Sequence, residues 1–173
     1  YLATLSNALQ VIHSQSLELP RIQTNGVLFL DEGGILILPP MILERLRSVQ
    51  IDEDRHRTFD IYNHPDLVGE DAVVFSLGIL GYRIATGELP FDGADEYELR
   101  HLMREYIPLT ARQKRPEVRE EVAAAFAAAL NNKDERPSLE ALNTSIERFA
   151  KDGLFADVDV RTKDQIVEQS TQL

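Results

Sequence analysis

The stretch FSLGILGYRIATGELPF, residues 75–91, decides the fold because it reads as one buried helix and the turn that ends it. From residue 73 to residue 85 the chain is apolar nearly all the way round, which predicts a central helix surrounded by protein. Gly87 predicts the end of that helix, because glycine readily adopts the left-handed cap. Pro90 blocks any continuation. We therefore expect a mainly α-helical domain built around this central buried helix.

Helical spacing of apolar residues predicts one helix before the central helix and three after it, at 2–14, 95–106, 117–130 and 139–151. Ser138 is placed to cap the last helix and Gly153 to end it. We expect residues 1–153 to form one domain and residues 154–173 to form a polar C-terminal tail.

Two short apolar runs, at 27–30 and 35–38, flank the sequence DEGG, a pattern typical of a β-hairpin. Pro39 and Pro40 follow the second run, and proline lacks the amide hydrogen that a strand ladder needs. We expect a short hairpin packed on the helical bundle, followed by an irregular stretch at 42–63.

Composition excludes several classes of function. The net charge of −11 argues against nucleic-acid binding, and the one local basic stretch, RQKRPEVR at 112–119, is interpreted as a solvated loop and helix start. Cysteine is absent, which removes disulfides and thiolate metal sites. No apolar run approaches the roughly 18 residues of a membrane span, and the first residues lack the basic region of a secretory signal. We expect a cytoplasmic protein that contacts neither nucleic acid nor membrane.

Four segments in a fixed order resemble the C-terminal lobe of the eukaryotic-type protein kinase family, over residues 1–151. The central helix is similar to the family's D-x-W-S-L-G helix with its T-G-x-x-P-F turn. The other three are LFLDEGGILIL at 28–38, which resembles the strand pair beside the catalytic loop, HPDL at 64–67, which resembles the Ala-Pro-Glu motif, and DERPSLEAL at 134–142, which resembles the D-P-x-x-R-P-S segment. The resemblance implies a kinase-like lobe whose N-terminal partner lobe, if present, precedes Tyr1.

The resemblance also implies that the catalytic positions are degenerate. With His13 taken as the family's histidine before the catalytic loop, the catalytic Asp position falls on Arg21 and the magnesium-binding Asn position on Gly26. The second magnesium-binding position falls on Pro39, and the central helix's Asp position on Val73. An arginine cannot act as a base at neutral pH, and Mg²⁺ requires oxygen ligands.

From these positions we expect a catalytically inactive, pseudokinase-like domain that acts as a protein-binding, scaffolding or regulatory module, with no cofactor or metal. The resemblance implies one surviving structural ion pair, between Asp66 and Arg136. A partner is expected on the face around 95–115 or on the stretch 42–63. The candidate contact residues are Leu99, Leu102 and Met103, for which core packing is the alternative.

Two alternatives stay open. The first is a divergent active kinase lobe in a shifted alignment, with Asn25 and Asp31 recruited to bind metal and Glu18 as base. The second is a nucleotide-binding but inactive regulator. Both need a glycine-rich phosphate loop and a strand lysine, neither of which occurs in this chain. Hydroxyls open to regulatory phosphorylation are Ser48, Thr58 and Tyr62. The histidines, interpreted as surface or loop residues, are His13, His56, His64 and His101.

Overall fold

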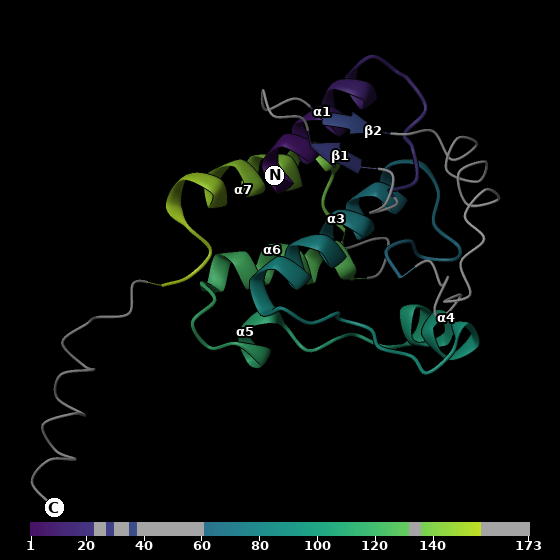
Figure 1. Cartoon of the computed structure of the whole chain (residues 1–173), viewed down its shortest axis with the longest axis vertical. Coiled ribbons are helices and arrows are strands. Elements are labelled where there is room, and N and C mark those ends of the chain that lie inside the picture. Colours follow the sequence, from purple (N-terminus) through teal and green to yellow (C-terminus); the bar gives the residue numbers. More distant parts are fainter. Residues whose placement is uncertain (23–26, 30–34, 38–60, 132–135, 157–173) are drawn as a thin grey trace, which may run out of the picture.

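The computed structural model describes residues 1–22, 27–29, 35–37, 61–131 and 136–156. Within these residues the chain forms six helices and one antiparallel strand pair (Figure 1), so the mainly α prediction is confirmed. The elements are α1 (Leu2–Ser14), β1 (Val27–Phe29), β2 (Ile35–Ile37), α3 (Gly69–Thr86), α4 (Glu96–Glu105), α5 (Ala111–Lys114), α6 (Glu120–Leu130) and α7 (Leu139–Asp152). None of these helices is both long and apolar enough to cross a bilayer.

Helix α3 occupies the centre of the molecule, as the sequence predicts. Nearly every residue from Ala72 to Ile79 is inaccessible to solvent. Gly87 ends the helix in the left-handed conformation, with φ of 82°. The helix begins at Gly69, four residues earlier than predicted. The apolar pattern missed the first turn because that turn carries acidic side chains.

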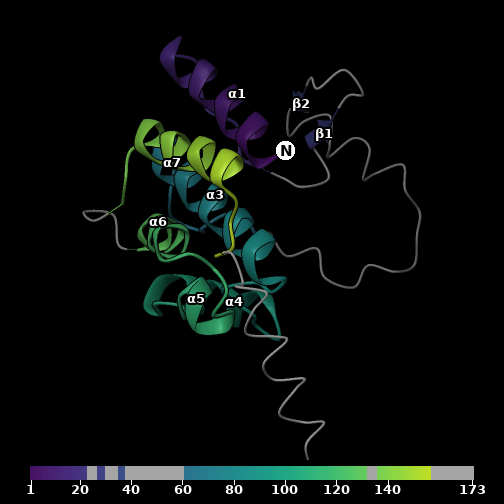
Figure 2. The same ribbon diagram turned by 90° about the vertical axis from the view of Figure 1, so that its left-hand side faces the viewer.

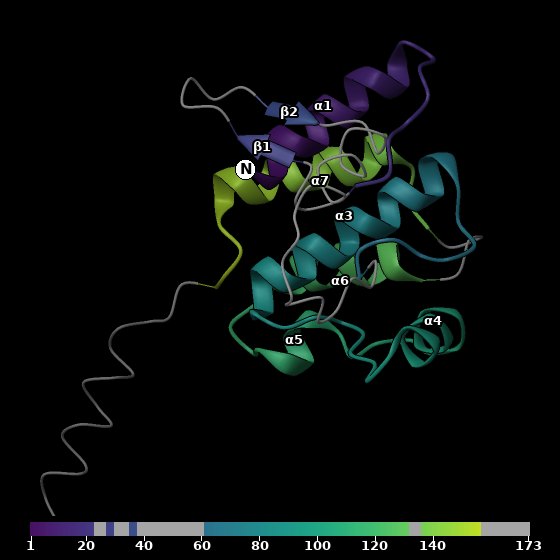
Figure 3. The same ribbon diagram turned by 45° about the vertical axis from the view of Figure 1, so that its right-hand side comes forward.

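The helices form three tiers (Figures 2 and 3). In one outer tier α1 lies along α7, in the middle tier α3 packs against α6, and α5 lies with α4 on the opposite side. The strands pair antiparallel with Val27 opposite Ile37, as expected for the predicted hairpin, and β2 contacts α1. The contact between α3 and α6 is close, because Gly81 faces the ring of Phe126.

Two features depart from the expected elements. The short helix α5 begins with a capping box between Thr110 and Gln113, a local signal that lacks an apolar stripe. Residues 154–156, which the prediction assigns to the polar tail, make contacts with the rest of the chain. Leu154 packs against the core, and the Ala156 amide donates to the Glu117 carbonyl at 2.9 Å.

Candidate functional site

The predicted catalytic positions within the described residues are Arg21 and Val73. Arg21 is exposed, and it lines a small pocket of about 120 Å³ beside the first turns of α4. Val73 is 2% exposed within the apolar core, so packing accounts for a valine there. Glu18, the alternative base, is exposed. The remaining candidates, Asn25, Gly26, Asp31 and Pro39, lie outside the described residues.

A buried polar relay holds the backbone next to Arg21. The Asn63 amide donates to the Ile22 carbonyl at 2.7 Å, and its oxygen accepts from the Ser76 hydroxyl at 3.1 Å. Asn63 and Ser76 are 4% and 0% exposed, so neither can exchange these bonds for water. The relay connects the central helix to the segment that follows α1. Sequence reasoning missed Asn63; its position directly before the HPDL motif was the one available signal.

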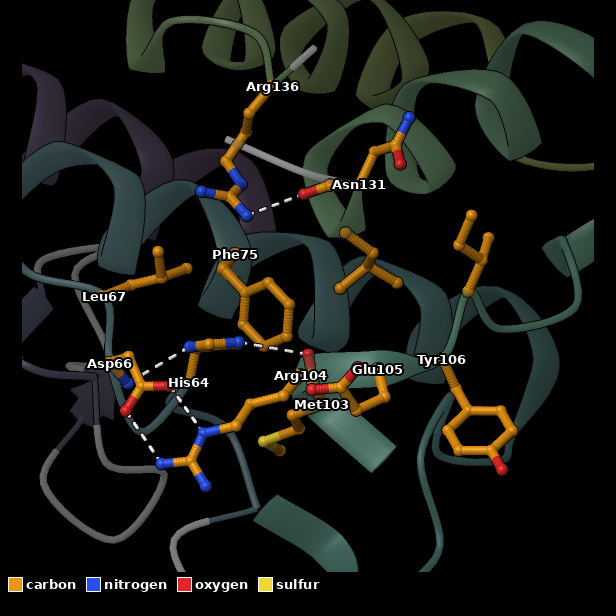
Figure 4. A pocket seen from close by; sticks show the side chains of 12 residues that line it. His64, Asp66, Leu67, Phe75, Met103, Arg104, Glu105, Tyr106, Asn131 and Arg136 are labelled. Carbon is orange, nitrogen blue, oxygen red and sulfur yellow. Dashed lines mark hydrogen bonds and ion pairs between the residues drawn. The ribbon is translucent and has the colours of Figure 1, made fainter. Parts of the chain in front are cut away.

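The larger pocket, of about 440 Å³, lies between the turn before α3, the C-terminal end of α4 and the end of α6 (Figure 4). His64 is half-buried in its wall. The His64 Nε2 lies 3.0 Å from the Met103 carbonyl, and Nδ1 accepts from the Asp66 amide at 3.1 Å. Both ring nitrogens are therefore occupied, which leaves neither available as a general base. Burial lowers the pKa of His64, as expected for a ring removed from water.

Asp66 does not pair with Arg136, and that prediction is corrected. Its carboxylate instead makes a two-point contact with the Arg104 guanidinium, at 2.5 Å from Nε and 2.8 Å from Nη2. These hydrogen bonds lower the pKa of Asp66 and raise that of Arg104. Both side chains are about half exposed, so the pair orients α4 more than it stabilises the fold.

Arg136 performs a different structural task from the one expected. Its side chain is 4% exposed; Nε donates to the Ala129 carbonyl at 3.1 Å and Nη2 to the Asn131 carbonyl at 2.7 Å. A cation that binds the last carbonyls of α6 is favourably placed against the helix dipole. Nη1 lies 3.6 Å from Asp71 Oδ1, beyond hydrogen-bond length. Arg136 therefore joins the C-terminal end of α6, through two hydrogen bonds, to Asp71 in the first turn of α3, through an ion pair.

A second acidic residue of that turn secures α7. Glu70 Oε1 accepts from the Leu139 amide at 2.7 Å, and Oε2 lies 3.7 Å from His13 Nε2 on α1. The segment that resembles D-P-x-x-R-P-S therefore contacts the start of the central helix twice, through the Leu139 amide at Glu70 and through Arg136 at Asp71. Ser138 caps α7 as predicted, by accepting from the Ala141 amide.

The expected partner surface is largely buried, so the core-packing alternative is correct for its main residues. Leu99 is 4% and Met103 6% exposed, and Leu102 is partly buried against the same core. The outward residues of this region are different ones. Tyr97 is 84% and Ile107 78% exposed, and Tyr106 and Leu109 also lie mostly in solvent.

Of the three hydroxyl side chains considered for phosphorylation, the structure describes only Tyr62. Tyr62 is 5% exposed, and its hydroxyl accepts a hydrogen bond from Arg83, so the folded protein does not present it to an enzyme. Ser48 and Thr58 lie outside the described residues. Among the residues that the structure describes, no group of three His, Asp or Glu side chains is placed to hold a metal ion.

No protein-family model matches this chain, and no curated protein sequence matches it.

Proposed function

We propose that the chain is a kinase-like C-terminal lobe that has lost phosphotransfer and acts as a protein-binding module in the cytoplasm. The order of one helix, a strand pair, the central helix and the helices that follow it supports this proposal. The observation that carries it is the placement of Arg21. Arg21 carries a positive charge at the position where the resemblance requires a proton acceptor. The backbone beside it is held by the hydrogen bond from Asn63 to the Ile22 carbonyl.

The relay through Asn63 and Ser76 gives this proposal a physical basis. In the family an aspartate of the central helix fixes the catalytic-loop backbone, and here the corresponding residue is Val73. A neutral amide performs the anchoring at Ile22 instead. The neutral Asn63 amide is sufficient if the segment at Ile22 has to keep its conformation but does not catalyse a reaction. The amide also avoids the free-energy cost of a buried, unpaired carboxylate.

The direct test measures magnesium-dependent phosphotransfer by the longest natural chain that contains these residues, together with its melting temperature with and without ATP and magnesium. We expect no transfer and no shift. A ligand that binds the native state raises the melting temperature by mass action, so a shift without transfer would support the nucleotide-binding regulator instead. Transfer that is abolished by Asn63→Ala would overturn the proposal.

The partner surface is proposed on the outward residues of the 95–115 face, in place of the buried ones. Tyrosine is among the residue types that concentrate binding energy at protein interfaces, and the exposed aliphatic side chains beside Tyr97 and Tyr106 add apolar contact area. A photo-crosslinking residue at Tyr97 or Ile107 should capture a partner protein. The matched control replaces Val11, which is 55% exposed on α1 at the opposite tier. Equal capture from both faces would argue against this surface.

A further inference from the structure

Residues 106–109 form an extended segment between α4 and α5 (Figure 1). Tyr106 has extended backbone angles, with φ of −114° and ψ of 137°. Pro108 restricts its own φ and disfavours the helical region for Ile107 before it. The side chains of Ile107 and Leu109 are exposed, while Pro108 between them is half-buried. An alternation with a period of two is the pattern of a β-strand.

The main chain of this segment has unused hydrogen-bonding groups. At one end the Tyr106 amide donates to the Leu102 carbonyl at 3.1 Å, and at the other the Thr110 amide belongs to the capping box of α5. Between these ends, the amides of Ile107 and Leu109 and the carbonyls of the segment make no hydrogen bond within the part of the chain that the structure describes. Water satisfies such groups in the free protein, so they are available to the main chain of a partner.

The unused groups have the arrangement of a strand edge. In an extended chain the amide and the carbonyl of one residue point to the same side, and those of the second residue along point to that side again. Ile107 and Leu109 therefore offer two donors and two acceptors along one edge. Pro108 has no amide hydrogen, and it lies at the intervening position, which makes no bond on that edge. The proline is therefore compatible with pairing through its two neighbours.

The segment also borders the larger pocket. Tyr106 and Ile107 line this pocket of about 440 Å³, and Phe75 and Met103 contribute to its wall (Figure 4). A strand that pairs with the segment can therefore place a side chain in the pocket. Direct strand pairing and a neighbouring side-chain pocket are the two parts of peptide recognition by strand addition.

The charges near the segment favour a basic partner. Glu105, directly before the segment, is exposed and forms no ion pair with any residue that the structure describes. The cations that follow the segment, Arg112 and Lys114, are each paired with a glutamate. The whole chain carries a net charge of −11. Complementary charge speeds the encounter with a partner and fixes its register.

We propose that residues 106–109 are a docking strand, to which a partner protein adds an extended, basic peptide in antiparallel orientation. The peptide exchanges main-chain hydrogen bonds with Ile107 and Leu109. Its alternate apolar side chains pair across the strands with these two side chains, which lie on one face of the segment. This inference rests on the proposed protein-binding function and adds the chemistry of the partner.

Selection from a phage-displayed library of random dodecapeptides, against the longest natural chain that contains these residues, tests the partner chemistry. The selected peptides should alternate apolar and polar residues and carry a net positive charge. At saturation with such a peptide, the amides of Ile107 and Leu109 should exchange with water at least about tenfold more slowly, as measured by solvent-exchange NMR on the unaltered protein. A library that yields no binding peptide, or a bound peptide that leaves these two amides unprotected, would overturn the proposal.

Two variants at one position separate main-chain pairing from side-chain contact. Ile107→Ala and Ile107→Pro both remove the isoleucine side chain, but only the proline also removes the amide hydrogen. The extended backbone of Tyr106 is compatible with a following proline. The proline variant should bind the selected peptide about threefold to tenfold more weakly than the alanine variant, because one main-chain hydrogen bond is lost. Equal affinities of the two variants would contradict the docking strand.

These outcomes distinguish the docking strand from the function on which it rests. Peptide binding that weakens in Ile107→Ala, and no further in Ile107→Pro, would retain the proposed partner surface and refute the strand pairing. Failure of the proposed function would appear instead in the crosslinking comparison between Tyr97 and Val11, which does not depend on the Ile107 amide.

Discussion

Replacing Gly81 with alanine tests the closest approach between the two middle helices. A methyl group at Gly81 would lie 2.6 Å from Cδ1 of Phe126 and closer still to its Cε1 and Cζ. Carbon atoms pack at about 3.5–4.0 Å, so the ring would have to move by roughly 1.5 Å to relieve its closest contact. Phe126 is 1% exposed and its ring packs edge-on against Phe149, which leaves little space for that movement.

The expected cost of Gly81→Ala follows from two opposing effects. Overpacking a well-packed core costs about 1–3 kcal/mol, and this clash belongs at the upper end of that range. Alanine recovers up to about 1 kcal/mol through its better helix propensity. The net loss in free energy of unfolding should be about 2 kcal/mol. With an m value of about 2 kcal/mol/M, the urea midpoint would fall by about 1 M.

Urea unfolding followed by far-ultraviolet circular dichroism is the suitable assay, since the chain has no tryptophan. Gly78→Ala is the graded control, because its methyl would meet Ala129 Cβ at 2.9 Å and should cost less. Gly81→Ala combined with Phe126→Leu should be less destabilised than the sum of the single changes, with a coupling of about 1–2 kcal/mol. A Gly81→Ala protein that is as stable as the original would refute the packing argument.

Three further predictions concern the site and its surroundings. Asn63→Ala should lower the free energy of unfolding by about 2–3 kcal/mol, because it leaves buried polar partners unsatisfied; Asn63→Asp, which cannot donate to Ile22, should be no better in the same urea titration at pH 7. Gly93→Ala would place a methyl 2.7 Å from Leu99 Cα and closer to its amide, so the melting temperature should fall by about 5 °C; an unchanged value would mean that α4 starts differently. The pKa of Asp66 is lowered in the folded state, so its contribution is present above pH 3.8 and lost as the pH falls through the folded value; the stability difference from Asp66→Asn should shrink in that range, and a constant difference would contradict the ion pair.

The helices were predictable because their signals are local. The pattern of apolar residues predicted every described helix except α5, and the caps at Gly87 and Ser138 act within one turn of the residue that carries them. The strand pairing followed equally from two apolar runs close together in the chain. Helix α5 escaped prediction because a four-residue helix is too short to display an apolar stripe.

The contacts of the site were not predictable in the same way. Asp66 and Arg136 were paired on the basis of the resemblance alone. In the structure α4 passes beside Asp66, and its Arg104 binds both carboxylate oxygens of Asp66. Arg136 instead hydrogen-bonds the end of α6 and forms an ion pair with Asp71 of α3. Which residue of an amphipathic helix faces the core also depends on the neighbours, and that is why Leu99 proved to be buried.

The sequence by itself determined that this protein is mainly helical, where most helices begin and end, and that one of them is surrounded by the others. Those properties depend on residues within one or two turns of each other, and the spacing of apolar side chains records them directly. Only the tertiary structure decided that His64 is half-buried with both ring nitrogens engaged, and that Asn63 anchors the backbone beside Arg21. Such bonds join groups that are distant in the chain, and their existence depends on distances and burial that exist only after the helices have packed.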